Sequence, residues 1–297
     1  GVINLMGGLG ALLAFFVGSR LYSMNPALPF VFAGILMILI TLALRFRIRE
    51  PEVVEGAGEG GETVGILEAL GEVRRDPDRS ARCMLLAIFF WFIAWNGIEA
   101  FFTLYGKDVW GISEASGALY LGFFSLALVA FAIPAGFLAT AIGRARTIKI
   151  GIVGLAVCLS IIGLVGSDAL GRPVLVLLNK LFYAGSTRAD GQLTIVGVML
   201  ARASVIVPAV LALAGMFWAA ININSYPMVV DMAAKSKTGA YTGLYYLFSS
   251  LAAITGPPVF GLLRDLFGMK ALFPFAVLCA LIALVFMDGV KRGEPQV

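Results

Sequence analysis

Eight long apolar stretches determine what this chain can fold into. Each approaches or exceeds the roughly 20 residues with which an α-helix crosses the hydrocarbon core of a bilayer. The chain is 60% hydrophobic and only 13% charged, whereas soluble domains are normally about one quarter charged. The sequence therefore predicts an all-α polytopic membrane protein with eight transmembrane helices. We expect these helices at residues 2–17, 27–44, 83–104, 118–138, 150–165, 204–230, 241–263 and 271–287.

A hydrophilic segment, residues 46–82, separates the second predicted span from the third. Its first half is rich in glycine and glutamate and is typical of a flexible linker. In its second half, Ile66, Leu67, Leu70 and Val73 recur at helical spacing, which predicts a short amphipathic helix at the membrane surface. If this segment is cytoplasmic and the sides alternate, most basic residues fall on the cytoplasmic side, as the positive-inside rule requires.

Residues 167–202 contain two apolar pieces, each too short to cross a bilayer. The first covers 174–184 with an interruption, and the second covers 193–200. We interpret the whole segment as an interfacial or partly re-entrant loop on the outer side. Counting it as a further span would move the last basic turns outside and weaken the charge bias.

Several function classes lack the residues they need. The chain has no histidine, which excludes histidine metal sites and histidine proton relays. Its cysteines, Cys83, Cys158 and Cys279, have no CxxC spacing and lie in or beside apolar runs, so we expect buried thiols. GxxxxGK[ST], HExxH and GxSxG are absent. We therefore expect no enzyme activity, no metal and no cofactor other than a coupling ion, and no nucleic-acid partner.

The stretch 217–268 carries polar groups inside two neighbouring spans. It holds asparagines, tyrosines, an aspartate and paired prolines between apolar residues. Such groups cost free energy in lipid unless they face the protein interior or a water-filled path. Two adjacent spans of this kind indicate the wall of a polar cavity, as in a transporter or a channel.

Two turns resemble motifs of the major facilitator superfamily. The turn from Gly136 to Arg146 (GFLATAIGRAR) is similar to the family's cytoplasmic G-x-L-a-D-r-x-G turn in its second-half copy. The turn from Gly261 to Gly268 (GLLRDLFG) is similar to the related turn on the outer side. Thr140 stands where the family's first-half copy has aspartate, which argues against the charge relay attributed to that aspartate.

The resemblance implies the major facilitator fold, which has two bundles of six helices. Residues 1–45 would then be the last two helices of the N-terminal bundle, and residues 46–82 the cytoplasmic linker. Residues 83–297 would be the C-terminal six-helix bundle. The chain would begin at the family's fifth helix, as an N-terminally truncated transporter that does not transport as it stands.

Two further strings resemble the cation–sugar symporter branch of that superfamily. They run from Trp95 to Tyr105 (WNGIEAFFTLY) and from Tyr241 to Ser250 (YTGLYYLFSS), and the second is followed by a GPP motif at Gly256. The resemblance implies proton-driven symport of a sugar or glycoside by alternating access, in a prokaryotic plasma membrane, by a protein that is monomeric at full length. An exporter or permease for another solute, such as a drug, nucleoside or peptide, remains an alternative, as does a non-transporting membrane scaffold.

Glu99 is the candidate coupling acid. A charged carboxylate deep in a span is costly, so its protonation is a natural coupling step. Asn96 and Trp95 precede it by three and four residues, so all three should share one helix face that presents an amide and an aromatic ring to a sugar. The alternative is a structural carboxylic acid that remains neutral.

The sixth and seventh spans supply further candidate substrate contacts. Asn222, Asn224 and Tyr226 precede Pro227, and amides that both donate and accept suit sugar hydroxyls. Their alternative role is hydrogen bonding between helices. Of the adjacent Tyr245 and Tyr246, at least one should face the cavity, because neighbours on a helix point about 100° apart.

The remaining candidates concern movement. Asp231 lies close to a basic turn and is a candidate gate residue if it pairs with Arg144 or Arg146; the alternative is a solvated acid at a helix end. Two glycines of the motif turn, Gly136 and Gly143, are assigned to the same gate by the resemblance. Because prolines remove backbone hydrogen bonds, hinges are expected at Pro227 and at Gly256, Pro257 and Pro258. For Gly256, Pro257 and Pro258 the alternative is a static kink that accommodates a neighbouring helix.

Overall fold

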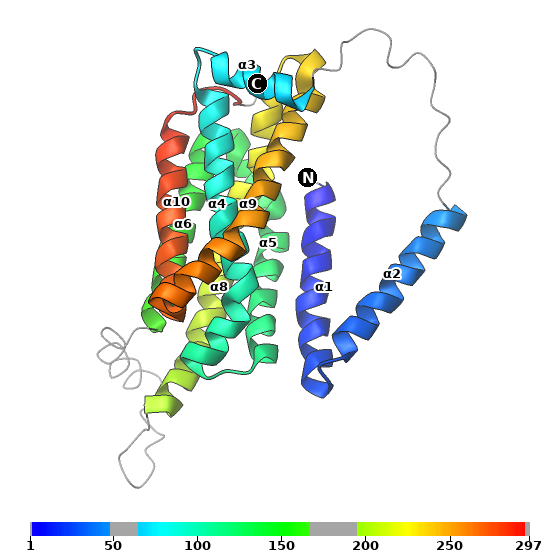
Figure 1. The fold of residues 1–297 in the computed structure, drawn as a ribbon, viewed down its shortest axis with the longest axis vertical. Coiled ribbons are helices and arrows are strands. Elements are labelled where there is room, and N and C mark those ends of the chain that lie inside the picture. The colour runs from blue at the N-terminus through cyan, green and yellow to red at the C-terminus, as the bar shows by residue number, and fades with distance from the viewer. Residues whose placement is uncertain (1, 48–64, 167–194, 295–297) are drawn as a thin grey trace.

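The computed structural model describes residues 2–47, 65–166 and 195–294, and these form helices with no strand. Two long helices precede a short one and a bundle of six follows (Figure 1). The helices are α1 (Val2–Met24), α2 (Leu28–Arg47), α3 (Ile66–Arg75), α4 (Ser80–Tyr105), α5 (Glu114–Ile142), α6 (Arg144–Val165), α8 (Ile195–Asp231), α9 (Thr238–Phe267) and α10 (Leu272–Asp288). A π-helical turn, Gly106–Trp110, continues α4, and 3-10 turns precede α9 and α10.

Seven of the described helices are long and apolar enough to cross a membrane: α2, α4 with its π-helical turn, α5, α6, α8, α9 and α10. They match seven of the predicted spans. The first predicted span coincides with α1, whose 23 residues rise about 35 Å along the axis at 1.5 Å per residue. The expectation of an all-α polytopic membrane protein is therefore confirmed.

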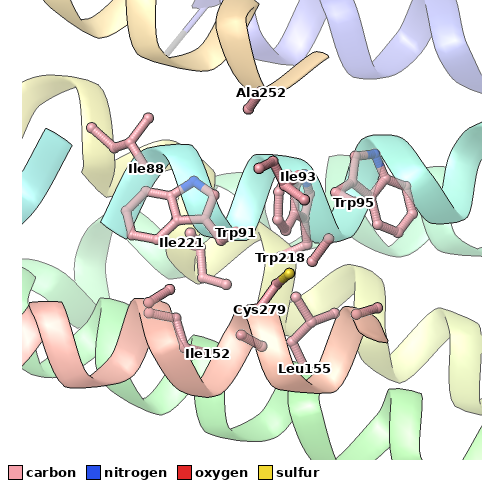
Figure 2. Packing of buried hydrophobic residues seen from close by; sticks show 14 of the residues in the cluster. Ile88, Trp91, Ile93, Trp95, Ile152, Leu155, Trp218, Ile221, Ala252 and Cys279 are labelled. Carbon is pink, nitrogen blue, oxygen red and sulfur yellow. The ribbon is translucent and has the colours of Figure 1, made fainter. Parts of the chain in front are cut away.

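The six described helices α4, α5, α6, α8, α9 and α10 pack around an apolar core. Helix α8 lies between α5 and α6, and α4 lies between α9 and α10. Figure 2 shows part of this core, with Trp91 of α4, Ile152 and Leu155 of α6, Ile221 of α8 and Cys279 of α10. Because these side chains are almost fully buried, they fix the positions of the helices that carry the candidate site.

Helix α1 joins this bundle through α5, and α2 does not. Phe16 stacks edge-on against Phe123, with ring centroids 5.8 Å apart. The Ser19 hydroxyl donates to the Ala115 carbonyl at 2.7 Å, and the Tyr22 hydroxyl donates to Glu114 at 3.3 Å. Helix α2 touches α1 and then diverges from the bundle (Figure 1), so its apolar surface stays uncovered by the described residues.

The charged residues gather at the two ends of the bundle. The end that carries α3, the start of α6 and the end of α8 is called the basic end (Figure 1). Four sets of ion pairs join its elements: Lys237 with Glu72, Arg292 with Asp76 and Asp78, Arg144 with Asp231, and Lys149 with Asp288. At the opposite end Lys107 pairs with Glu114. The four basic residues of these pairs, all predicted on the cytoplasmic side, therefore lie at one end of the bundle.

Helix α3 confirms the predicted amphipathic helix and lies across the basic end (Figure 1). It begins at Ile66, as the apolar spacing indicated, and its buried residues Ala69 and Val73 pack toward α9 and α4. Leu67 stays 83% exposed. The helix therefore caps the bundle with one face and leaves the other open.

The predicted sixth span, 204–230, agrees with the membrane-spanning part of α8, Val205–Asp231. The helix itself begins earlier, at Ile195, so residues 195–202, which we assigned to the loop 167–202, are helical. The physical reason is that apolarity marks the lipid boundary, whereas a helix continues into water as long as its residues tolerate helical geometry. The rest of the predicted loop, residues 167–194, lies outside the described residues.

Candidate transport site

Glu99 lies on an exposed surface of a membrane-spanning helix. Trp95 is the middle residue of the span Ser80–Trp110, and Glu99 follows one turn later. The Glu99 side chain is exposed in the structure, with the Trp95 side chain as its hydrogen-bond partner. A charged carboxylate at this depth is strongly disfavoured against lipid, so a charged Glu99 would have to face water or further protein. A role of Glu99 in proton coupling stays a prediction.

Trp95, which we predicted as an aromatic platform for a sugar, is largely buried, and its role in binding stays a prediction. Its side chain is only 8% exposed and stacks on Phe124 of α5, with ring centroids 3.9 Å apart and an interplanar angle of 15°. It also lies beside Trp218 of α8, at 5.3 Å. The ring that was expected to meet a sugar therefore packs between α4, α5 and α8, because its large apolar surface gains more from burial there.

Asn96 lies next to Gly256 of α9. The Asn96 Nδ2 donates to the Phe92 carbonyl one turn earlier at 2.7 Å, and Gly256 of α9 packs against Ile93 and Asn96. The side chain is half-buried. Trp95 and Asn96 therefore flank Glu99 on two sides, and the predicted shared face is divided between two neighbouring helices.

The two asparagines of α8 have different surroundings. Asn224 is 3% exposed, and its Nδ2 donates to the Ala220 carbonyl at 2.9 Å and to the Ala135 carbonyl of α5 at 3.3 Å. Its amide thus links two helices. Asn222 is half-buried, and its side chain makes no hydrogen bond with the described residues. Of the two, Asn222 is the one that has its amide available for a solute.

Three tyrosines form a hydroxyl-bearing cluster between α8 and α9. Tyr226 and Tyr245 meet edge-on at 5.4 Å, and Tyr246 lies 6.2 Å from Tyr226. The Tyr226 hydroxyl is 3.2 Å from Thr242 Oγ1, and the Tyr245 hydroxyl is 3.3 Å from Ser225 Oγ. Tyr245 is buried and Tyr246 is 56% exposed, so the two adjacent rings have different surroundings, and the role of either at a cavity stays a prediction.

A continuous line of aromatic contacts connects this cluster to the middle of the bundle. Phe92 of α4 provides the link, at 5.6 Å from Trp218 and 6.4 Å from Tyr245. We call the whole line the ring series, and its members in order are Phe124, Trp95, Trp218, Phe92, Tyr245, Tyr226 and Tyr246. Phe92, Phe124 and Trp218 were not predicted as site residues, because isolated aromatic residues in an apolar span look like ordinary core.

The predicted hinge residues lie within continuous helices. Pro227 is inside α8, and both Pro257 and Pro258 are inside α9, so none of them ends its helix. Gly256 is buried against the backbone of Ile93. The prolines therefore remove individual backbone hydrogen bonds while the helices continue, and their role as hinges stays a prediction.

Arg144 and Asp231 are brought together at the basic end. The Arg144 guanidinium, at the start of α6, pairs with the Asp231 carboxylate at the end of α8. Arg146 is exposed and Gly136 is half-buried, and neither takes part in this ion pair. Gly143, between α5 and α6, has a φ of +93°, a value that favours glycine.

Sequence reasoning missed the segment after α10, which reaches the same ion pair. Glu294 accepts hydrogen bonds from the first backbone N–H groups of α6, and Arg144 also donates to the Gly293 carbonyl at 3.2 Å. These residues carry no apolar periodicity, so the sequence pattern did not indicate that this segment packs against the bundle. The described residues contain no cluster of three or more potential metal ligands.

The chain's likeness to known proteins agrees with this architecture. The sequence pattern of the family described as Major Facilitator Superfamily matches residues 1–187, which is more than half of the chain. The matched region starts at α1 and includes α4 with Glu99, α5, the motif turn and α6. The chain is therefore a member of the Major Facilitator Superfamily, a family of membrane transporters for small solutes.

Proposed function

We propose that this transporter couples proton entry to the symport of a sugar or glycoside by alternating access. The observation that carries the proposal is the exposed Glu99 carboxyl group in the membrane interior. A charged carboxylate there is disfavoured, whereas a protonated one is tolerated, so movement across the membrane can be tied to one bound proton.

The groups available to a solute fit a polyhydroxylated ligand. Asn222 has its amide available, Asn96 retains its amide oxygen, and Tyr246 presents an aromatic ring with a hydroxyl on an open surface. Amides donate and accept, as sugar hydroxyls do, and an aromatic ring covers the apolar face of a pyranose. Tyr226, half-buried beside Tyr246, extends this surface along α8.

The orientation follows from charge. In the proposal the basic end faces the cytoplasm, because arginine and lysine accumulate on that side of membrane proteins. The Arg144–Asp231 ion pair then lies at the inner end, where it acts as a gate within the bundle formed by residues 83–297. Residues 1–45 belong to the other bundle in this proposal, with 46–82 as the connecting segment.

The test uses the whole protein reconstituted in vesicles with an imposed pH gradient. A panel of radiolabelled sugars identifies a substrate, and Glu99→Gln is compared with the unaltered protein. We expect Glu99→Gln to abolish gradient-driven accumulation and to retain solute exchange at equal pH, because the neutral amide mimics the protonated acid.

The matched control is Glu114→Gln, which neutralises an acid at the opposite end of the bundle. It should retain accumulation. If Glu99→Gln accumulates solute as fast as the unaltered protein, Glu99 is not the coupling acid. If none of the sugars is taken up while a nucleoside, peptide or drug is, the sugar assignment is wrong.

A further inference from the structure

The residues that follow α10 cross the basic end and touch three other helices. Residues 290–294 contact the start of α4, the start of α6 and the last turns of α8. Val290 is buried and Gly293 is buried, although both belong to a short segment without helical structure. The segment is therefore held in place by contacts with other helices and not by secondary structure of its own.

Arg292 fastens this segment to the residues between α3 and α4. Its Nη2 lies 2.5 Å from Asp76 Oδ2 and its Nε lies 2.7 Å from Asp78 Oδ2. The backbone N–H of Lys291 donates to Ser80 Oγ at 2.9 Å. One guanidinium thus bridges two carboxylates, the geometry in which an exposed ion pair is most effective.

Glu294 fastens the other end of the segment to α6. Its two carboxylate oxygens accept from the N–H groups of Arg144 at 2.6 Å and Ala145 at 3.1 Å. Helix N-termini leave such N–H groups without intrahelical partners and carry a partial positive charge. Glycine at position 143 makes room, because a Cβ there would lie 3.0 Å from a Glu294 oxygen.

Gly293 brings the segment into contact with the ion pair. With a φ of +91°, it passes so close to α8 that a Cβ would lie 2.5 Å from the Met228 carbonyl oxygen. The Gly293 carbonyl then accepts from Arg144 Nη1 at 3.2 Å. Arg144 therefore holds Asp231 and the segment at the same time.

We propose that residues 290–294 are a clasp that locks the basic end of the bundle. When closed, the clasp ties the connection between α3 and α4 to the end of α10, caps α6 and orients Arg144 toward Asp231. When released, it uncovers the start of α4 and leaves Arg144 with one partner fewer. The clasp concerns a conformational state of the bundle and is independent of which solute the protein carries.

A native thiol reports on this state. Cys83, in the first turn of α4, is half-buried, and a Cβ on Gly289 would lie 2.6 Å from its sulfur. The thiol is therefore covered where the chain enters the clasp. Cys158 and Cys279 are buried in the core and serve as internal controls for global unfolding.

The experiment measures the rate at which a water-soluble thiol reagent modifies Cys83 in the full chain in nanodiscs. We expect Glu294→Ala to raise this rate roughly three- to tenfold, the range that corresponds to losing a helix cap. Arg292→Ala should raise it roughly two- to fivefold, in line with an exposed ion pair. Cys158 and Cys279 should stay unmodified in both.

Two comparisons decide the outcome. The first is the control Glu114→Gln, which removes an acid at the opposite end of the bundle and should leave the labelling rate of Cys83 unchanged. The second is hydrogen exchange of the Arg144 and Ala145 amides, which should be faster in Glu294→Ala than in the unaltered protein. Unchanged Cys83 labelling and unchanged exchange in both clasp variants would overturn the proposal. If either clasp variant exposes Cys158 or Cys279, that variant is replaced by Ser80→Ala, which removes the acceptor of the Lys291 N–H. An unchanged labelling rate of Cys83 in Ser80→Ala would then contradict the proposal.

Discussion

Trp95 of α4 and Phe124 of α5 stack nearly parallel, with ring centroids 3.9 Å apart. The contact joins two helices that otherwise touch little, and it lies at the middle of the membrane-spanning part of α4. Stacked aromatic rings gain about 0.5–1.5 kcal/mol beyond the burial of their surfaces. Trp95 thus contributes to the stability of the bundle.

Replacing Trp95 should therefore destabilise the protein more than it alters solute binding. We expect Trp95→Ala to cost about 3–5 kcal/mol of unfolding free energy, as large-to-small changes of buried aromatic residues do. Trp95→Phe, which keeps a ring against Phe124, should lose much less. Thermal unfolding in nanodiscs measures both variants. A loss of solute affinity without a drop in melting temperature would show instead that Trp95 is a binding platform.

Asn222 and Asn224 should separate into a binding and a structural residue. Asn224→Ala leaves the Ala135 carbonyl of α5 without its donor, and helix-linking hydrogen bonds in membranes contribute about 0.6 kcal/mol on average. We expect this modest loss of stability with little change in solute affinity. Asn222→Ala should lower solute affinity with little change in stability. Melting temperatures and solute-binding isotherms of the two variants, measured side by side, check the assignment; a reversed pattern contradicts it.

The Arg144–Asp231 ion pair should show a small coupling energy. The Asp231 side chain is 44% exposed, so solvent screens the interaction and we expect about 0.2–1 kcal/mol. A double-mutant cycle with Arg144→Gln and Asp231→Asn measures this energy from unfolding. Because Arg144 also holds the Gly293 carbonyl, Arg144→Gln should cost more than Asp231→Asn. Equal costs would indicate that the second contact contributes nothing.

Acid should weaken the attachment of the clasp. The hydrogen bond from Arg292 holds the pKa of Asp76 below its usual value of 3.8, and hydrogen bonds from Ser80 do the same for the pKa of Asp78. Since both folded-state pKa values are lowered, their stabilising effect is present above the unfolded pKa and is lost as pH falls through the folded values.

The measurement compares the unaltered protein with Asp76→Asn over an acid titration of the Cys83 labelling rate. At each pH the rate of the variant is divided by that of the unaltered protein, so that the loss of the reactive thiolate in acid cancels. This ratio should exceed one at neutral pH and fall to one below a pH of about 3.8, the unfolded value. Rates that converge well above this value would assign the effect to a different group.

Much of the fold could be predicted because the bilayer imposes a simple length rule. The apolar runs located the spans, and the spacing of Ile66, Leu70 and Val73 located α3. The sixth span was located by its apolar run, but helix α8 begins before it, at Ile195, because the change in polarity at Arg202 does not end the helix. A residue's depth can be read from the sequence, whereas a helix end in water cannot.

The site was less predictable, because the long spans are apolar on every side. Periodicity could place Trp95 and Asn96 near Glu99 but could not tell which neighbouring helix each one meets. The contacts of Glu294 with α6 join residues about 150 positions apart and involve exposed charges without a pattern. Such contacts depend on how the helices pack against one another in three dimensions, which a single sequence does not show.

The ring series has a mechanical consequence. Its rings come from α4, α5, α8 and α9, and each touches the next, so a shift of one helix along its axis would separate several ring pairs together. These four helices should therefore travel as one rigid block during transport. A displacement of Tyr246 at the exposed surface would then be transmitted through the ring series to Phe124. Phe124 lies on α5, the helix against which α1 packs.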